Sequence, residues 1–316
     1  MTSGQVRVAV VGVGEIGRGW ASLCVAAGWP VTLFDNSATA MDGAPAIVAG
    51  RARALAALER ADEDAIERGI AGLTVGRSLL QACADAQWII ESIDEDLQAK
   101  QKVFEAFESV APKARAVTSS SSRLTTKDIA ARCRRPDRCL VAHPLNPPEL
   151  IPLVELVPGP HTDTTLLEVI KGWLRALGRI PVIIKKSVPG NVASRIAAAV
   201  WREAIDLVLQ GVIDVDDLDR AVSVGPALVW AAGGPHLTHH LAAGEQQAAG
   251  FFQTLCQEQE VYWADLAGWA KLEPADQQRL IRAIGAAYTG QSAQIRRARN
   301  RRVAAILRAV EEARTD

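Results

Sequence analysis

The feature that most constrains this chain is a glycine-rich turn that follows a short run of mostly β-branched residues. Residues 6–11 read Val-Arg-Val-Ala-Val-Val. Such a run is typical of a strand buried on both faces of a parallel sheet. Gly12, Gly14 and Gly17 follow at the GxGxxG spacing, where a helical pattern begins. A strand, a glycine turn and a helix in this order predict a dinucleotide-binding unit.

Each position of the turn has a physical role in this prediction. Gly12 would allow the tight turn, Gly14 would let the backbone approach the pyrophosphate, and Gly17 would let helix and strand pack closely. The helix begins at Glu15 and Ile16. Free N–H groups and the positive end of the helix dipole would face the phosphates there.

Asp35 indicates which nicotinamide cofactor, NAD or NADP, the glycine turn would bind. It ends the second strand pattern, 23 residues after Gly12, where a carboxylate would accept hydrogen bonds from both ribose hydroxyls. The carboxylate would repel a 2′-phosphate, and the next residue is Asn36 and not arginine. The expected cofactor is therefore NAD and not NADP. A structural glycine turn with a surface aspartate is the alternative that this context disfavours.

The pattern of elements predicts two domains. A chain of 316 residues exceeds the size of an ordinary single core. Strand and helix patterns alternate up to Pro189, which predicts a mainly parallel Rossmann-type sheet in an α/β fold. Only helical patterns follow, ending with a helix over residues 292–312. We expect an NAD-binding domain over residues 1–189 and an all-α substrate and dimerisation domain over residues 190–316.

Composition argues against several classes of partner. The net charge of −1 provides no field that would attract nucleic acid or an anionic membrane, and no apolar run approaches the ~18 residues of a spanning helix. Five widely spaced cysteines predict neither a disulfide framework nor a zinc site. His236 and His240 share a helical face without an acidic residue between them, so no metal is expected. The first residues lack a signal-peptide pattern, and we expect a cytoplasmic protein.

A histidine follows one strand pattern, and a glutamate lies within the next. His143 comes directly after the strand pattern of residues 139–142, and Glu155 lies twelve residues later within that of residues 150–156. Open α/β sheets bind ligands at the carboxyl ends of strands, and imidazole is suited to accept a hydroxyl proton. A carboxylate bonded to the imidazole would fix its tautomer. On spacing alone, a structural histidine is the favoured alternative.

The segments around these two residues resemble a known signature. Residues 141–148 read Val-Ala-His-Pro-Leu-Asn-Pro-Pro, and residues 151–155 read Ile-Pro-Leu-Val-Glu. This resembles the 3-hydroxyacyl-CoA dehydrogenase superfamily, in particular the branch of L-gulonate 3-dehydrogenase (lambda-crystallin) and L-carnitine dehydrogenase. The resemblance covers essentially the whole chain and is densest over residues 7–35 and 88–222.

The resemblance assigns roles to residues and implies a homodimer. It implies that His143 and Glu155 are the catalytic pair, that Ser122 hydrogen-bonds the substrate oxygen, and that Asn146 is the asparagine of the histidine motif. Glu95 and Lys100 match residues that line the nicotinamide side. Acidic residues at an exposed helix start would also complement the helix dipole, and both interpretations can hold.

One segment departs from the family pattern. The family reads Pro-Gly-Phe, two residues, then Asn-Arg, and its asparagine helps to hold the substrate. Here Asn191 occupies the phenylalanine position and Ser194 the asparagine position, followed by Arg195. Ser194 and Arg195 are the expected substrate residues, although a serine has a shorter reach than an asparagine.

We expect the substrate to be a small 3-hydroxy acid, similar to gulonate, 3-hydroxybutyrate or carnitine, that loses a hydride from C3 to NAD. The proline- and glycine-rich turn of related CoA enzymes is missing at residues 225–228. Arginine or lysine would bind the carboxylate. Aromatic faces could hold a quaternary ammonium group, although packing between helices is the favoured explanation for these aromatic residues. The cationic candidates are Lys185, Lys186, Arg123 and Arg195, and the aromatic candidates are Trp201, Trp230, Tyr262 and Trp263. A 3-hydroxyacyl-CoA dehydrogenase and a non-catalytic, crystallin-like NADH-binding protein are the alternatives.

Overall fold

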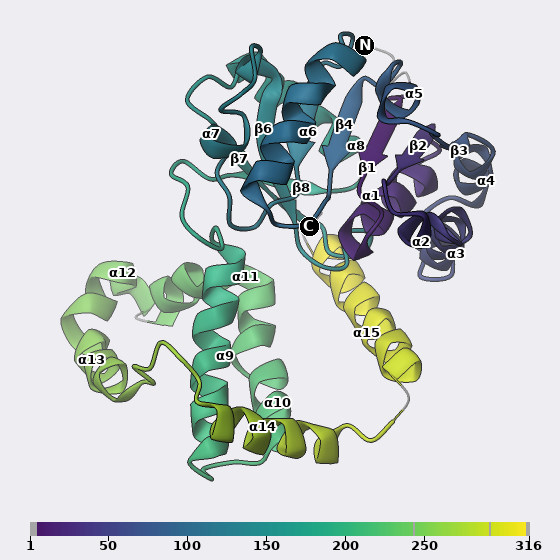
Figure 1. The fold of residues 1–316 in the computed structure, drawn as a ribbon. Coiled ribbons are helices and arrows are strands. Elements are labelled where there is room, and N and C mark those ends of the chain that lie inside the picture. Colours follow the sequence, from purple (N-terminus) through teal and green to yellow (C-terminus); the bar gives the residue numbers. More distant parts are fainter. Residues whose placement is uncertain (1–4, 243, 291, 314–316) are drawn as a thin grey trace. The chain divides into compact units, whose positions relative to one another are not determined.

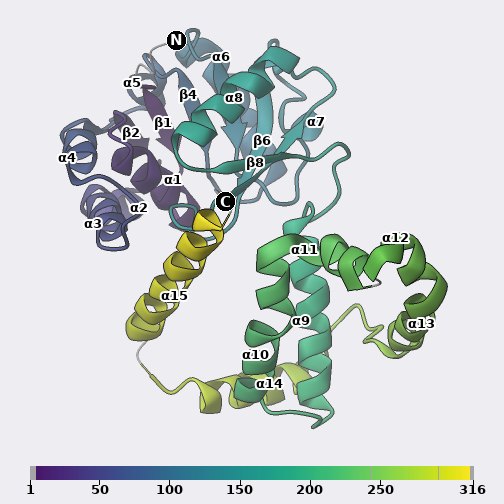
Figure 2. The ribbon, with the colours of Figure 1, turned by 180° about the vertical axis from the view of Figure 1, so that it is seen from behind.

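The computed structural model describes residues 5–242, 244–290 and 292–313. The chain divides into two compact units, Met1–Ser194 and Arg195–Asp316. All the strands within these described residues belong to the first unit, and the second unit is helical where it is described (Figures 1 and 2). This confirms the expected α/β, Rossmann-type unit followed by an all-α unit.

The first unit is built on one eight-stranded sheet, with the strand order β3-β2-β1-β4-β5-β6-β7-β8 (Figure 1). Its strands are β1 (Val8–Val11), β2 (Val31–Phe34), β3 (Leu73–Val75), β4 (Trp88–Glu91), β5 (Ala116–Ser119), β6 (Cys139–Pro144), β7 (Leu153–Pro158) and β8 (Ile180–Ile183). All neighbouring pairs are parallel except β6 and β7, which are antiparallel. The sheet is therefore mainly parallel, as expected.

Helices cover both faces of the sheet. They are α1 (Glu15–Ala26), α2 (Ala38–Met41), α3 (Ala44–Ala56), α4 (Glu63–Ala71), α5 (Leu79–Cys83), α6 (Leu97–Val110), α7 (Thr126–Ile129) and α8 (Thr164–Ala176). Val8 and Val10 of β1 belong to the core beneath α1, α3 and α8, whereas Ala9 and Val11 belong to the core beneath α5 and α6. Figures 1 and 2 show α6 and α8 on opposite faces. Because alternate residues of β1 enter different cores, this strand is apolar throughout.

Three places in the first unit differ from what the sequence pattern indicates. Residues 45–70 are rich in Ala, Leu, Glu and Arg and read as one helical stretch, but they form two helices. Asp62 accepts a hydrogen bond from the N–H of Ala65 and starts α4 anew. Strand β3 has only three residues, too few for a clear pattern. The expected strand over residues 150–156 begins only at Leu153, because the N–H groups of Leu150 and Ile151 donate to the Pro147 carbonyl in a turn.

The second unit contains helices of very different length. They are α9 (Ala193–Leu209), which starts in the first unit, α10 (Val215–Val224), α11 (Pro226–Ala242), α12 (Gln247–Gly250), α13 (Cys256–Asp265), α14 (Pro274–Ala287) and α15 (Ser292–Glu312). On α9, Ile205 is buried, whereas Ile196 and Trp201 are exposed. Among the residues that the structure describes, no helix has the length and apolar composition needed to cross a bilayer.

Candidate active site

Two of the three glycines in the turn after β1 leave no room for a side chain. Gly12 has φ +92°, and a Cβ added there would lie 2.5 Å from the carbonyl of Ser92. A Cβ at Gly17 would lie 1.9 Å from the carbonyl oxygen of Gly12, whereas nothing lies within 4 Å of one at Gly14. Gly14 precedes α1, whose N-terminus has no side-chain cap, and Ile16 in its first turn is half-buried. The first N–H groups of α1 are thus left available to an anion.

Asp35 lies against this turn at the end of β2. Its Oδ2 accepts a hydrogen bond from the N–H of Val13 at 2.9 Å, and its Oδ1 accepts one from the N–H of Ser37 at 2.9 Å. The backbone thus fixes the carboxylate beside the glycine turn, where a ribose would follow the pyrophosphate. Glu15 at the helix start is paired with Arg51 of α3 at 2.7 Å.

His143 and Glu155 form a buried pair across β6 and β7. The antiparallel register places the two residues directly opposite each other, which explains their separation of twelve residues. The distance between His143 Nδ1 and Glu155 Oε2 is 2.9 Å, and the residues are 7% and 1% exposed. Nδ1 is engaged by the carboxylate, so Nε2 is the ring nitrogen left for other chemistry.

The second oxygen of Glu155 binds the start of α9. Glu155 Oε1 accepts hydrogen bonds from the N–H groups of Val192 at 2.9 Å and Ala193 at 3.0 Å. The N–H of Gly190 in the same segment donates to the carbonyl of Ser122 at 3.1 Å. The structure therefore brings together His143, Glu155, the backbone of Ser122 and residues 190–193. The sequence analysis missed the contacts to residues 190–193, and no local pattern could have shown them.

The other expected catalytic and substrate residues lie in different surroundings. Ser122 is half-buried in the loop that follows β5, and Asn146 is exposed in the segment after β6. Ser194 is half-buried in the first turn of α9, at the end of the first unit. Arg195 is exposed and opens the second unit.

Lys100 lies in a buried charge network at the carboxyl end of β4. Its Nζ is 2.6 Å from Glu91 Oε1 and 3.5 Å from Glu95 Oε2, and it donates to the carbonyl of Ile93 at 3.1 Å. Lys100 is 1% exposed and Glu91 is 0% exposed. Ser119 Oγ donates to the other oxygen of Glu91 at 2.6 Å. Burial raises the pKa of the Glu91 carboxyl above its ordinary value, and the Lys100 charge and these hydrogen bonds act against that rise.

The sequence analysis did not single out Glu91, although a carboxylate that ends the apolar strand Trp-Ile-Ile-Glu was a visible signal. Glu95 lies nearby and accepts hydrogen bonds from Ser121 Oγ and from the N–H of Arg123. Partial burial acts to raise the pKa of Glu95, but the Ser121 hydrogen bond and the Lys100 charge outweigh it and lower the pKa below its ordinary value.

The cationic and aromatic candidates for substrate binding belong to several different elements. Lys185 and Lys186 are exposed after β8, and the guanidinium of Arg123 donates to the carbonyl of Glu95 at 3.1 Å. The four aromatic candidates belong to three helices, namely α9 (Trp201), α11 (Trp230) and α13 (Tyr262 and Trp263). Within the described ranges, no three His, Cys, Asp or Glu side chains are grouped so that they could hold a metal ion.

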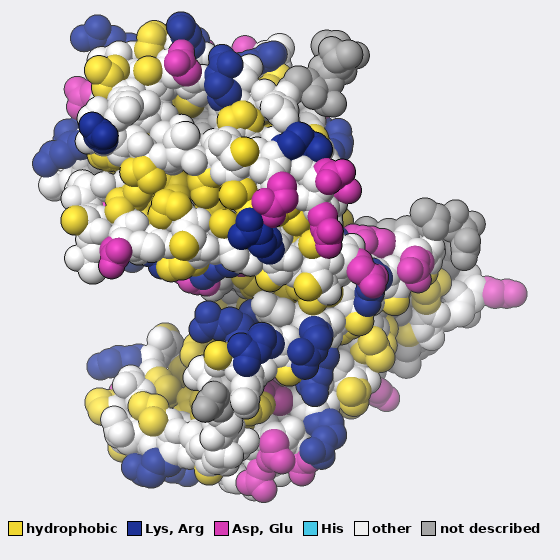
Figure 3. All heavy atoms as spheres, turned by 90° about the vertical axis from the view of Figure 1, so that its right-hand side faces the viewer, with side chains coloured by type: hydrophobic (Ala, Val, Ile, Leu, Met, Phe, Trp, Pro, Cys, Tyr) yellow, Lys and Arg dark blue, Asp and Glu magenta, His cyan; other side chains and the backbone are white. Residues whose placement is uncertain are grey.

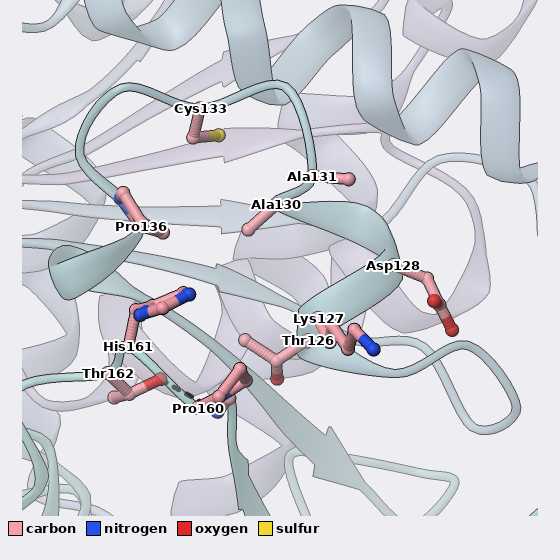
Figure 4. Close-up of a pocket in the computed structure, with 11 residues that line it drawn as sticks. Thr126, Lys127, Asp128, Ala130, Ala131, Cys133, Pro136, Pro160, His161 and Thr162 are labelled. Carbon is pink, nitrogen blue, oxygen red and sulfur yellow. Dashed lines mark hydrogen bonds between the residues drawn. The ribbon is translucent and has the colours of Figure 1, made fainter.

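A cavity of about 350 Å³ lies toward the other end of β6 and β7 (Figure 4). Its lining comes from α7, the loop that follows it and residues 159–162, including Thr126, Cys133 and His161. Thr162 donates to the carbonyl of Cys139, at the start of β6, whereas His143 lies near the end of that strand. The cavity is therefore separate from the His143–Glu155 pair.

Two family models match consecutive parts of the chain. Residues 7–187 match the model of the 3-hydroxyacyl-CoA dehydrogenase NAD-binding domain, and residues 190–279 match that of the 3-hydroxyacyl-CoA dehydrogenase C-terminal domain. The chain is 32% identical to L-carnitine dehydrogenase of Nocardiopsis dassonvillei over 96% of this chain and 92% of the relative. It is 36% identical to L-carnitine dehydrogenase of Burkholderia mallei over 82% of this chain and 79% of the relative.

A solved structure covers nearly the full length of the chain. The NAD⁺-dependent dismutase FHMPC 5-dehydrogenase superposes with a TM-score of 0.81 at 26% identity, over 98% of this chain and 99% of that one. The matched NAD-binding domain confirms the expected cofactor, NAD. The chain therefore belongs to the 3-hydroxyacyl-CoA dehydrogenase family, and it is an NAD-dependent dehydrogenase.

Proposed function

We propose that this dehydrogenase oxidises the C3 hydroxyl of a small 3-hydroxy acid, with His143 as the general base. The observation that carries the proposal is the buried contact between His143 Nδ1 and Glu155 Oε2. The relatives named L-carnitine dehydrogenase support a free hydroxy acid as the substrate, because carnitine is itself a 3-hydroxy acid.

The pair is arranged for proton transfer. When Nδ1 carries the proton that it donates to Glu155, the lone pair of Nε2 is free to accept the C3 hydroxyl proton. The imidazolium that forms then lies beside the Glu155 carboxylate, which stabilises its charge. Bound NAD would accept the hydride from C3.

Other residues of the chain would position the reactants. Ser122 would hydrogen-bond the reacting oxygen, and Asn146 belongs to the same proposed catalytic set. Gly12, Gly14 and Gly17, with the start of α1, would hold the pyrophosphate, and Asp35 would hold the ribose. The Glu95–Lys100 pair would line the nicotinamide side, and Ser194 and Arg195 would contact the substrate.

An activity panel tests the proposal and separates the alternatives. L-carnitine, 3-hydroxybutyrate, L-gulonate and 3-hydroxybutyryl-CoA would each be offered with NAD, and NADH would be followed by its absorbance. A free hydroxy acid should be the preferred substrate. Preference for the thioester would favour the 3-hydroxyacyl-CoA alternative, for which a relative of that name, 33% identical over 77% of this chain, provides an argument. A chain that binds NADH but oxidises none of the four would be the crystallin-like alternative.

The base is tested by substitution. His143→Ala should reduce turnover by about 10²- to 10⁴-fold, the usual contribution of a general base. Its Kd for NADH, measured by fluorescence titration, should stay near that of the parent chain. Unchanged turnover would refute the role of His143 and leave the family membership intact.

We also propose that the chain forms a homodimer through its helical unit. Hydrophobic side chains reach the surface of both units (Figure 3). In the helical unit the most exposed of them include Trp201 at 62%, Phe252 at 68% and Val261 at 68%. Side chains of this size are usually covered by a partner when they cluster. Light scattering after size-exclusion chromatography should give twice the 33.8 kDa chain mass, and a mass of one chain would refute the dimer.

A further inference from the structure

Four consecutive serines, residues 119–122, run from the end of β5 into the loop that follows it. The hydroxyls of the first three share hydrogen bonds with other side chains of the first unit, which are Glu91 for Ser119, Ser92 for Ser120 and Glu95 for Ser121. Within the described residues, the Ser122 hydroxyl shares none, and Ser122 is half-buried. Ser122 is therefore the serine of this run whose hydroxyl is left to a ligand.

The hydroxyl of Ser121 is fully engaged within the protein. Ser121 is 2% exposed. A hydroxyl has one hydrogen to donate and two lone pairs that accept. Ser121 Oγ donates its hydrogen to Glu95 Oε1, and it accepts from the N–H groups of Leu124 at 2.8 Å and Arg123 at 3.3 Å. The Ser121 hydroxyl thus fixes the loop around Ser122 and has no hydrogen left for a ligand.

One carboxylate oxygen binds both neighbours of Ser122. Glu95 Oε1 accepts from Ser121 Oγ and also from the N–H of Arg123, at 3.0 Å. The Arg123 guanidinium in turn donates to the Glu95 carbonyl at 3.1 Å. We call the two hydrogen bonds of Glu95 Oε1 the Ser122 clamp. Because the clamp binds the residues before and after Ser122, it restricts the position of the Ser122 backbone between them.

Lys100 connects the Ser122 clamp to the sheet. Its Nζ lies 3.5 Å from Glu95 Oε2 and 2.6 Å from Glu91 Oε1, at the end of β4. The same ammonium group donates to the Ile93 carbonyl at 3.1 Å. Lys100 is 1% exposed, so solvent ions screen these contacts little. The position of Glu95, and with it that of the clamp, is therefore fixed to β4.

We propose that Ser121 is a positioning residue, which together with Glu95 holds the Ser122 hydroxyl in place for the reacting oxygen of the substrate. Ser121 would act through Ser122 and not by a contact of its own, because its hydroxyl is bound to Glu95, Arg123 and Leu124. This inference rests on the proposed function, in which Ser122 hydrogen-bonds that oxygen.

A double-mutant cycle tests whether Ser121 acts through Ser122. The variants are Ser121→Ala, Ser122→Ala and the double variant, and kcat/KM is measured at saturating NAD with the best substrate of the activity panel. Ser122→Ala should lower kcat/KM about 10-fold, the value of one hydrogen bond to the reacting oxygen. Ser121→Ala should lower it about 3- to 10-fold. The double variant should lose no more than Ser122→Ala alone, since the clamp has no hydroxyl left to position.

Ser109→Ala is the matched control. Ser109 is exposed on α6, where its hydroxyl donates to the Ala106 carbonyl, and its removal should leave kcat/KM unchanged. Ser121→Cys, which keeps a side chain of similar size with a weaker hydrogen bond, takes the place of Ser121→Ala in the cycle if the alanine variant does not fold.

The outcomes separate the inference from the proposed function. If the two losses multiply in the double variant, or if the Ser121 variant stays within twofold of an active parent chain, the inference is wrong and the proposed oxidation of a hydroxy acid stands. An unchanged kcat/KM in Ser122→Ala would refute both the role of Ser122 and the inference. If the parent chain oxidises none of the panel substrates, the proposed function fails and the inference fails with it.

Discussion

Replacement of Glu155 by glutamine tests how the carboxylate sets the tautomer of His143. A glutamine side chain has the same shape, but only one of its two terminal atoms accepts hydrogen bonds. In the parent chain Oε1 accepts from the N–H groups of Val192 and Ala193, and Oε2 contacts His143 Nδ1. The single amide oxygen of Glu155→Gln must therefore take one of these two places.

The two backbone donors determine the orientation. If the amide nitrogen faced Val192 and Ala193, two N–H groups would lose their acceptor, at about 1–3 kcal/mol each. The opposite orientation instead places the amide N–H against His143 Nδ1, which can adapt by losing its proton. The proton then resides on Nε2, and Nε2 can no longer act as a base.

The expected result is a loss of about 10²- to 10⁴-fold in kcat, the full contribution of a general base. Stability should fall only by about 1–2 kcal/mol, because one charge-assisted hydrogen bond becomes a neutral one. Turnover would be measured by NADH absorbance, and cofactor binding by fluorescence titration. Glu168→Gln on α8, where Glu168 pairs with Lys171 at the surface, is the control and should leave kcat unchanged. A kcat within threefold of the parent with normal NADH binding would refute the reasoning.

Three further predictions concern the cofactor side of the sheet. Gly17→Ala should abolish or strongly weaken NADH binding, measured by fluorescence titration, because its Cβ would lie 1.9 Å from the Gly12 carbonyl oxygen and displace the turn. Lys100→Met should cost about 3–5 kcal/mol in urea unfolding, because it leaves the Glu91 carboxylate buried without its ion partner, and adding Glu91→Gln should recover part of that loss. Glu95 should make stability depend on pH, since its pKa is lowered in the folded chain. Its carboxylate contributes stability above the unfolded pKa of about 4.3, which is lost as the pH falls through the folded pKa. The stability difference between the parent and Glu95→Gln in urea unfolding should thus narrow from pH 6 to pH 3, and a constant difference would contradict the assignment.

Local patterns predicted the cofactor half of the fold well. The β-branched run, the three glycines and Asp35 follow one another along the chain, and their geometry depends on contacts within one βαβ unit. The C-terminal helix was predicted with its observed bounds, Ser292–Glu312, because its polar and apolar residues alternate with a helical period.

The features that the sequence did not reveal depend on distant contacts. The antiparallel direction of β7 depends on the turn at Pro147, so spacing alone could not place Glu155 opposite His143. Glu91 becomes a buried ion partner only because α6 returns Lys100 to the end of β4. The contact of Glu155 with Val192 and Ala193 joins residues 37 and 38 positions apart.

The antiparallel ladder between β6 and β7 limits where this chain can change in length. A slip of one residue within the ladder would turn the Glu155 side chain to the opposite face of the sheet. A slip of two would restore the face but move the carboxylate about 7 Å along the strand, beyond reach of the imidazole. Chains that keep this pair can therefore gain or lose residues in the connection over residues 145–152. An insertion within either strand of the ladder would instead separate the Glu155 carboxylate from the His143 imidazole.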